Sequence, residues 1–424
     1  MDKLFILAII IFLATYVIII TEKYHRTIIA MFGASLMVLL GIVNQERAIE
    51  GVDFNTLGLL IGMMVIVSIA KDSGMFQYVA IKAAKFGQGD PKKIFILLAG
   101  IVAVFSALLD NVTTVLLMVP VTLVVTNNLK VRPKPFLIAT ILLSNIGGAS
   151  TLIGDPPNIM IGSAVGLSFN DFIVNLFPVT FIIGVATVAI LAFIYRKEFV
   201  FNQDAKDAIM KFKPNEAITN KKLLWKSLLV LGIVLLGFFT HGSTHLEGAT
   251  IALFGAALLL LMTVHEPEHN LREVEWTTIF FFVGLFILVT GLEEVGALHM
   301  MAGKIIEMTQ GNVVSTTMVV LWFSAIFSAI VDNIPFVATM IPLIKDIGSI
   351  TGMDLTPLWW ALALGADIGG NATIVGASAN VVVSGIAGRE GHKIGFVEYL
   401  KIAVPMTTIA MVICTGYIYV RYLM

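Results

Sequence analysis

Long apolar runs separated by short polar breaks dominate the chain. A helix needs about 20 apolar residues to cross the hydrocarbon core of a membrane, and eight runs reach or approach that length. Four lie in the first half of the chain and four in the second. These predicted crossings are residues 4–20, 27–43, 56–70, 172–195, 225–242, 248–264, 277–291 and 397–420.

Each half also carries two apolar segments that are interrupted by polar residues. Residues 94–126 form two arms around Asp110-Asn111, which predicts a re-entrant helical hairpin that enters and leaves on one side. Residues 136–164 contain a stretch rich in Gly, Pro and Asn, which predicts a helix broken at the middle of the membrane. The second half repeats the hairpin at 316–347 and the broken helix at 358–386.

The polar motifs recur at a constant offset of 222 residues (329 − 107 = 222). ALLDNVTTVLLMVP at 107–120 matches AIVDNIPFVATMIP at 329–342, and NIGGASTLIGDPPN at 145–158 matches DIGGNATIVGASAN at 367–380. A fixed offset over separated segments indicates a duplicated unit. With the broken helix counted as a crossing, each half has five crossings and one hairpin. Because five is odd, the second unit would lie upside down relative to the first. We therefore predict an all-α polytopic membrane protein of two inverted-topology repeats, 1–200 and 223–424, joined by a linker at 201–222.

Composition supports this class. Hydrophobic residues make up 58% of the chain and charged residues 13%, whereas a soluble domain carries roughly 25% charged residues. A soluble enzyme or scaffold is therefore excluded. The single cysteine, Cys414, excludes an intramolecular disulfide framework and a cysteine-built metal site. We expect no cofactor.

The basic residues predict an orientation. The loops at 21–26, 71–93, 127–135, 196–225, 265–276 and 385–401 would lie on one side, and all but five of the 27 Lys and Arg residues fall in or beside them. The positive-inside rule makes that side cytoplasmic. We therefore expect a plasma-membrane protein with both termini on the outer face and a cytoplasmic central linker. The five exceptions are Lys3, Arg47, Lys304, Lys345 and Arg421.

The hairpin tips and helix breaks place polar side chains at membrane depth. Non-helical backbone is tolerated there only where it is buried in protein or lines a wet cavity, so the tips and breaks should converge on one midplane site. Half-helix ends can bind both anions and cations, and hard cations take amide and hydroxyl oxygens as ligands. The candidate ion-binding residues are Asp110, Asn111, Thr113, Thr114, Asn145, Ser150, Thr151, Asp155, Asn158, Asp332, Asn333, Asp367, Asn371, Thr373 and Asn380, with sodium ligands proposed at Asp110, Asn111, Asp332 and Asn333.

Four aspartates in these segments need a physical reason, because a charge at the bilayer centre costs roughly 2.5–3.5 kcal/mol on insertion scales. Asp110 and Asp332 are either N-caps of the second hairpin arms or cation and proton ligands, and the two roles are compatible. Asp155 aligns with Ala377, and Asp367 aligns with Asn145, so each occurs in one half only. A purely architectural requirement should recur in both halves, which favours a chemical role for these two.

The pairing of LLDNVTTVLLMVP with IGGASTLIGDPPN resembles the ion transporter superfamily and its ArsB/NhaD permease family. It is most similar to the pink-eyed dilution (P protein) branch and its bacterial relatives, over essentially the whole chain. The resemblance implies an elevator-type carrier, usually a homodimer. In dicarboxylate carriers of the superfamily the matching tips hold sodium-site residues. Here Asp replaces Ser at both tips and Pro335 interrupts the second, which favours a small inorganic ion as substrate.

We therefore predict a secondary active transporter of a small inorganic ion, coupled to H⁺ or Na⁺. Sodium–proton antiport is the first hypothesis. An arsenite, oxyanion or organic-anion permease is the alternative, with a separate ATPase subunit if it is of the arsenite type. A passive chloride channel is the alternative from another class. The expected partners are the ion, the lipid bilayer and a second copy of the chain, with no nucleic acid.

Overall fold

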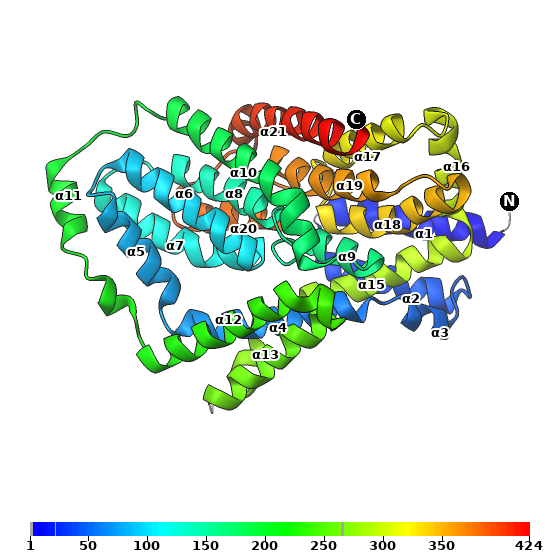
Figure 1. Ribbon diagram of the computed structural model, residues 1–424, viewed down its shortest axis with the longest axis horizontal. Helices are drawn as coiled ribbons and strands as arrows, with labels where there is room; N and C mark the ends of the chain where they lie inside the picture. Colours follow the sequence, from blue (N-terminus) through cyan, green and yellow to red (C-terminus); the bar gives the residue numbers. More distant parts are fainter. Residues whose placement is uncertain (1–2, 22, 264–266) are drawn as a thin grey trace.

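The computed structural model describes residues 3–21, 23–263 and 267–424 (Figure 1). These residues form helices and connecting turns, with no strand among them. In the described part, nine helices are long and apolar enough to cross a membrane, or up to ten when the bent pair α16 and α17 counts as one span. This confirms an all-α polytopic membrane protein. The expected crossing at 248–264 and loop at 265–276 include residues 264–266, which lie outside the described residues.

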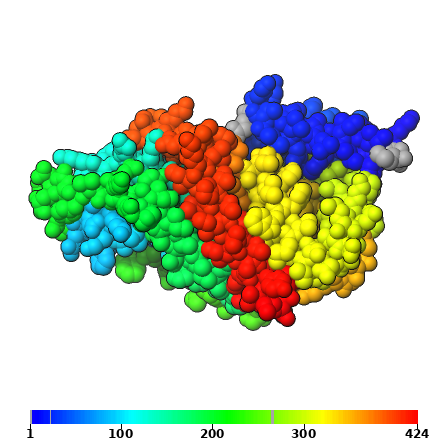
Figure 2. All heavy atoms as spheres, turned by 90° about the horizontal axis from the view of Figure 1, so that it is seen from above, coloured from blue at the N-terminus to red at the C-terminus, as the bar shows by residue number. Residues whose placement is uncertain are grey.

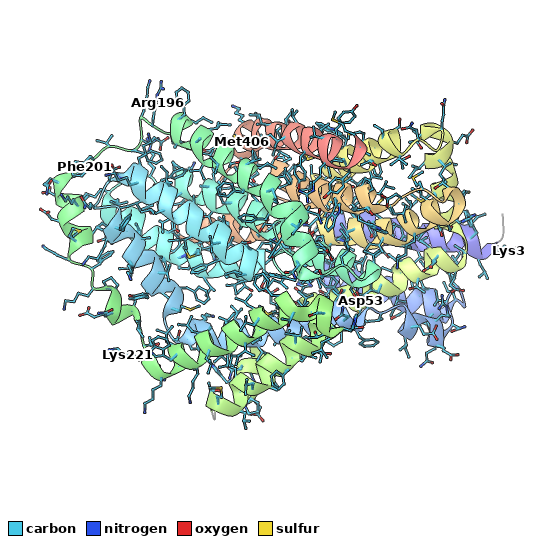
Figure 3. The ribbon with its side chains drawn as sticks, viewed as in Figure 1. Lys3, Asp53, Arg196, Phe201, Lys221 and Met406 are labelled. Carbon is cyan, nitrogen blue, oxygen red and sulfur yellow. The ribbon has the colours of Figure 1, made fainter. Side chains whose placement is uncertain are left out.

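The first half of the chain runs from α1 to α10. Its helices are α1 (Lys3–Ile20), α2 (Arg26–Leu39), α3 (Gln45–Glu50), α4 (Phe54–Asp72), α5 (Met75–Phe86), α6 (Pro91–Leu108), α7 (Asn111–Leu129), α8 (Lys134–Gly148), α9 (Pro156–Val165) and α10 (Phe169–Ile194). A linker with α11 (Gln203–Met210) and η1 (Pro214–Ala217) follows. It passes Arg196, Phe201 and Lys221 at the end of the molecule opposite Lys3 (Figure 3).

The second half follows the same plan. Its helices are α12 (Lys221–Thr244), α13 (Gly248–Thr263), α14 (Pro267–Arg272), α15 (Trp276–Glu294), α16 (Ala297–Thr309), α17 (Val313–Ser328), α18 (Asn333–Thr351), α19 (Thr356–Gly369), η2 (Gly370–Ala372), α20 (Ser378–Arg389), α21 (Phe396–Ile418) and η3 (Tyr419–Leu423). Helix α21 lies on the surface of the molecule, between helices of the first half and helices of the second half (Figure 2).

Helix boundaries recur at the offset of the sequence motifs. Helices α4 and α15 begin and end 222 residues apart (276 − 54 and 294 − 72), and so do α7 and α18 (333 − 111 and 351 − 129). The packing pairs correspond as well: α4 packs on α13 as α15 packs on α2, and α6 packs on α8 as α17 packs on α19. The two halves therefore share a helix plan, while their inverted orientation across a membrane stays a prediction.

The arms at the two tips are longer than the sequence indicated. Asp90 caps α6 and Pro91 starts it, so that helix extends to 18 residues, and α7 extends to 19. Each is long enough to cross a membrane, as is α18. Length therefore does not distinguish a re-entrant hairpin from two crossings. Helices α2 and α13, expected as crossings, have only 14 and 16 residues.

The Gly-rich stretches separate α8 from α9 and α19 from α20. Pro156 begins α9 because its fixed φ suits the first helical position. Each break is closed by an asparagine on its own backbone: Asn158 Nδ2 donates to Thr151 O at 3.0 Å, and Asn380 Nδ2 donates to Thr373 O at 2.8 Å. The amides thereby satisfy carbonyls that the interrupted helices leave free.

Helices α8 and α19 form the centre of the molecule (Figure 1). Every residue from Pro135 to Gly148, and from Pro357 to Gly369, is buried. Gly147 permits the close packing of α8 on α6, since a Cβ built there would lie 2.2 Å from the Ala103 carbonyl oxygen. Gly369 has the same relation to the Ala325 backbone in the second half. Both helices are therefore enclosed by protein rather than facing lipid.

Candidate functional site

Asp155 is the point at which both helix tips meet. It directly precedes α9 and is 1% exposed. Asn111, the first residue of α7, donates from Nδ2 to Asp155 Oδ2 at 2.7 Å, and Asn333, the first residue of α18, donates to Asp155 Oδ1 at 3.3 Å. One carboxylate thus accepts an equivalent amide from each half.

Asn145 connects the two broken helices. It lies near the end of α8, and its Nδ2 donates to the Oδ1 atoms of Asn371 and Asn380 at 2.8 Å each. Its Oδ1 accepts from Asn111 Nδ2 at 3.2 Å. The amide links one helix tip to the opposite break, and every one of these side chains is buried.

Asp367 is the counterpart of Asn145 on α19 and is fully buried. The amides of Asn158 and Asn333 face its carboxylate. Among the described residues, however, neither carboxylate oxygen has a hydrogen-bond partner, and Asn158 Oδ1 has none either. Buried polar atoms are normally satisfied, so these oxygens are candidate ligands for a cation or a proton.

The hydroxyls of the breaks have structural partners. Thr151 Oγ1 donates to Ala107 O at 2.5 Å, and Thr373 Oγ1 donates to Ala329 O at 2.6 Å. The first break is thereby bonded to the end of α6, and the second break to the end of α17. Ser150 Oγ donates to Gly147 O at 2.5 Å. Thr114, in contrast, is buried and its hydroxyl is without a partner among the described residues. The hydroxyls of Ser150, Thr151 and Thr373 have therefore used their hydrogens, and only their oxygen lone pairs are left to bind an ion.

The two tips differ in charge despite their similar sequences. Asp110 caps α7 by accepting from Thr113 N at 2.8 Å, and Asp332 caps α18 by accepting from Ile334 N at 3.3 Å. Asp332 also forms an ion pair with Arg26 at the start of α2. Asp110 forms no ion pair within the described part of the chain. The side chain of Thr113 is half-buried beside the tip.

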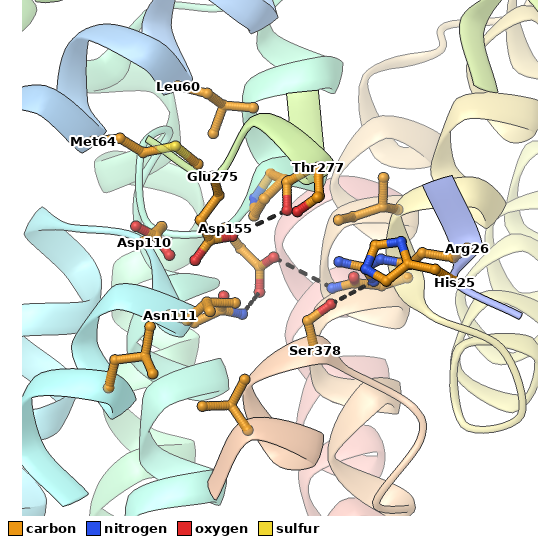
Figure 4. Close-up of a pocket in the computed structure, with 17 residues that line it drawn as sticks. His25, Arg26, Leu60, Met64, Asp110, Asn111, Asp155, Glu275, Thr277 and Ser378 are labelled. Carbon is orange, nitrogen blue, oxygen red and sulfur yellow. Dashed lines mark hydrogen bonds between the residues drawn. The ribbon is translucent and has the colours of Figure 1, made fainter. Parts of the chain in front are cut away.

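A cavity of about 210 Å³ lies beside these groups (Figure 4). The carboxylates of Asp110, Asp155 and Glu275 gather on one side of it, and His25 and Arg26 lie on the other. Glu275, just before α15, accepts from Thr278 Oγ1 at 3.0 Å. Burial raises the pKa of the Glu275 carboxyl, and the Asp110 carboxylate raises it further.

Sequence reasoning missed the cavity residues His25, Arg26, Glu275 and Ser378. The first three fell in predicted loops, and Ser378 aligns with Pro156 and so had no repeated signal. The duplicated motifs include the tips and breaks. They do not include the starts of α2 and α15, which lie across the cavity from them. Of the expected residues, Asn111, Asn145, Asp155, Asn333, Asn371 and Asn380 are joined in one hydrogen-bonded network.

The arrangement suits a small cation or a proton. Carboxylate and amide oxygens are hard ligands. Among the described residues no group of three or more His, Cys, Asp and Glu side chains could hold a metal ion. The oxygens that lie together at Asp155 belong to carboxylates and amides. A buried carboxylate is costly unless it is neutralised, which couples its charge to whatever ion or proton arrives.

A buried polar network beside a cavity, within a bundle of membrane-length helices, is typical of a membrane transporter. The chain belongs to the CitMHS family, described as a citrate transporter family, which it matches over residues 16–365.

The chain is 41% identical over 424 residues to the uncharacterized transporters Mb2703 of Mycobacterium bovis and Rv2684 of Mycobacterium tuberculosis, covering 98% of each chain. It is 33% identical to the P protein of Sus scrofa over 98% of this chain but only 59% of the P protein. These relatives support the resemblance to the P protein branch. Membership of the wider ArsB/NhaD family stays a prediction.

The fold is similar to that of the Alcanivorax borkumensis YdaH transporter. The TM-score is 0.62 at 12% sequence identity, and the match covers 99% of this chain and 98% of that one. At that identity the similarity establishes the fold alone.

Proposed function

We propose that the protein is a sodium–proton antiporter. The observation that carries the proposal is Asp155, a buried carboxylate that lines the cavity and accepts an amide from each half of the molecule. An ionised carboxylate in this setting requires a counter-charge. A sodium ion and a proton are alternative counter-charges for one group, and competition between them produces exchange.

The charge of the cavity supports a cation as the substrate. Three carboxylates line it, Asp110, Asp155 and Glu275, while the one arginine that lines it, Arg26, is already paired with Asp332. A lone anion would meet repulsion from all three carboxylates. Asp367, with both oxygens unpartnered among the described residues, adds a further acidic group behind Asp155.

We further propose that transport moves the tips and breaks together against the packed helices α2, α4, α13 and α15, as in an elevator. The tips and breaks are mutually hydrogen bonded, whereas α4 packs chiefly on α13 and α15 on α2. A unit tied by its own polar network can move as one body once its bonds to the other helices, Arg26 to Asp332 and Ser163 to Asp53 and Asn55, are released.

The test is ion-driven proton movement in proteoliposomes that contain a pH dye. Sodium, lithium, potassium, chloride, citrate and arsenite are added in turn to the wild type, to Asp155→Asn and to Asp204→Asn, a control at an exposed aspartate of α11. We expect sodium or lithium to move protons in the wild type and the control but not in Asp155→Asn. A response to anions alone would contradict antiport.

An organic-anion permease is the second candidate. It is favoured by Arg26 and Ser378, since a guanidinium and a hydroxyl at the start of α20 stand at the cavity and could receive a carboxylate. The family description also names citrate. In this case citrate, rather than sodium, would move protons in the same assay, and Arg26→Gln would abolish the response.

A further inference from the structure

We propose that Arg26 is a built-in cation which occupies the second of two equivalent tip positions, so that the protein binds one exchangeable cation per chain rather than two. The inference rests on the proposed function, since it concerns how many cations the site accepts. In this proposal Arg26 neutralises the Asp332 carboxylate. The transported ion binds at the other end of the cavity, beside Asp110 and Asp155.

Arg26 is held in place from several directions. Its Nη1 pairs with Asp332 Oδ2 and donates to Ser378 Oγ at 2.8 Å. Ser378 Oγ in turn donates to Asp332 Oδ2 at 2.7 Å, and the Arg26 guanidinium lies 4.9 Å from the centre of the Phe281 ring. The Asp332 side chain is only 13% exposed. The Arg26 side chain, 29% exposed, is thereby fixed beside the carboxylate, as a bound ion would be.

The equivalent position in the other half lacks every one of these partners. At the offset of 222 residues (248 − 26, 378 − 156 and 281 − 59), Arg26 corresponds to Gly248, Ser378 to Pro156, and Phe281 to Leu59. None of the three can supply a charge, a hydroxyl or an aromatic face. Two tips with the same Asp-Asn sequence therefore have different neighbours.

Asp110 accordingly has no resident cation. Its carboxylate forms no ion pair among the described residues, and Glu275 lines the same cavity. A cation that enters the cavity meets Asp110, Asp155 and Glu275 as attractive groups. At Asp332 it would instead meet a guanidinium that stays charged at any physiological pH. The electrostatics therefore direct a single cation to the first tip.

The test counts sodium ions bound per chain, with ²²Na⁺ on the purified full-length protein. We expect about one in the wild type, in Arg26→Lys, which retains the charge, and in the control Lys23→Gln, at an exposed basic residue of the same loop. Arg26→Gln frees the Asp332 carboxylate and should bind about two. The double variant Arg26→Gln/Asp332→Asn should return to about one.

Two sodium ions in the wild type, or one in Arg26→Gln with unchanged affinity, would overturn the inference while leaving antiport intact. No sodium bound by the wild type would overturn both proposals. Asp332→Asn provides an independent measurement should Arg26→Gln not fold. It leaves the guanidinium unpaired beside the cavity, so sodium should bind several-fold more weakly, and unchanged binding would again contradict the inference.

Discussion

The buried polar residues divide into those that occur in both halves and those that occur in one. The asparagines that close the breaks and the threonines that tie the breaks to the preceding helix ends recur with the same bonds. They therefore build the architecture. Asp155, Asp367 and Arg26 have no like residue at the equivalent position, and they add charges that only one half supplies.

This division also explains what the sequence could predict at the residue scale. The repeated motifs pointed to Asn111, Asn145 and Asp155, which the structure joins directly. Arg26 could not be found in this way, because it lies 306 residues from Asp332 and outside every motif. Only the three-dimensional packing of α2 brings it to the second tip.

Glu275 should set part of the pH dependence of transport. Burial and Asp110 raise its pKa, so it takes up a proton at a higher pH than an ordinary glutamate. As pH falls through this raised pKa the cavity loses a negative charge, and sodium binding should weaken. Glu275→Gln imitates the protonated state at all pH values, so it should weaken binding at high pH and flatten the profile.

The measurement is the sodium dependence of proton flux between about pH 5 and pH 8. Glu273→Gln, two residues earlier and half exposed in a pair with Lys71, is the matched control and should retain the wild-type profile. A Glu275→Gln profile that coincides with the wild type would show that this carboxyl does not face the ion.

At the scale of elements, the periodic and Gly-rich patterns located the helices and their interruptions, but not all of their lengths. Helix caps such as Asp90 extended the arms at the tips beyond the apolar runs, since capping depends on single polar residues rather than on hydrophobicity. The close approach of α6 to α8 was also invisible in the sequence, where Gly147 is one of 36 glycines.

Gly147→Ala should destabilise the protein by about 1–3 kcal/mol, the usual cost of overpacking. The new Cβ would lie 2.2 Å from the Ala103 carbonyl oxygen, so backbone would have to move. Gly100→Ala, on the α6 helix itself, is the control: nothing lies within 4 Å of its Cβ position. We expect thermal unfolding in detergent to show a lowered midpoint for Gly147→Ala alone; equal midpoints would refute the close packing.

At the scale of the whole molecule, hydrogen bonds join α4 to α9 beside a second cavity of about 270 Å³, which Asn55 and Ser163 help to line. Ser163 Oγ donates to Asp53 Oδ1 at 2.9 Å and accepts from Asn55 Nδ2 at 3.1 Å. Beside the cavity that holds Asp155, the equivalent residues are Glu275 and Gly385 (53 + 222 and 163 + 222), and glycine offers no hydroxyl. The two halves therefore differ in the contacts between these equivalent helices, while the orientation of the two cavities in a membrane stays a prediction from loop charge.

A cross-link between α4 and α9 should stop transport. In a background without the buried Cys414, Asn55→Cys/Ser163→Cys would join α4 to α9 on oxidation. If α9 moves relative to α4, flux should fall by about tenfold or more and recover on reduction. Each single-cysteine variant, oxidised in the same way, is the control. Full activity of the cross-linked protein would contradict movement between these helices.

Sodium binding with simultaneous proton release tests the central claim most directly. Purified protein in weakly buffered solution is titrated with sodium while a pH dye records released protons. We predict that the wild type and Asp204→Asn release about one proton for each sodium bound, and that Asp155→Asn releases none. Sodium binding without proton release, or undiminished release from Asp155→Asn, would contradict the account of Asp155 as the group for which the two ions compete.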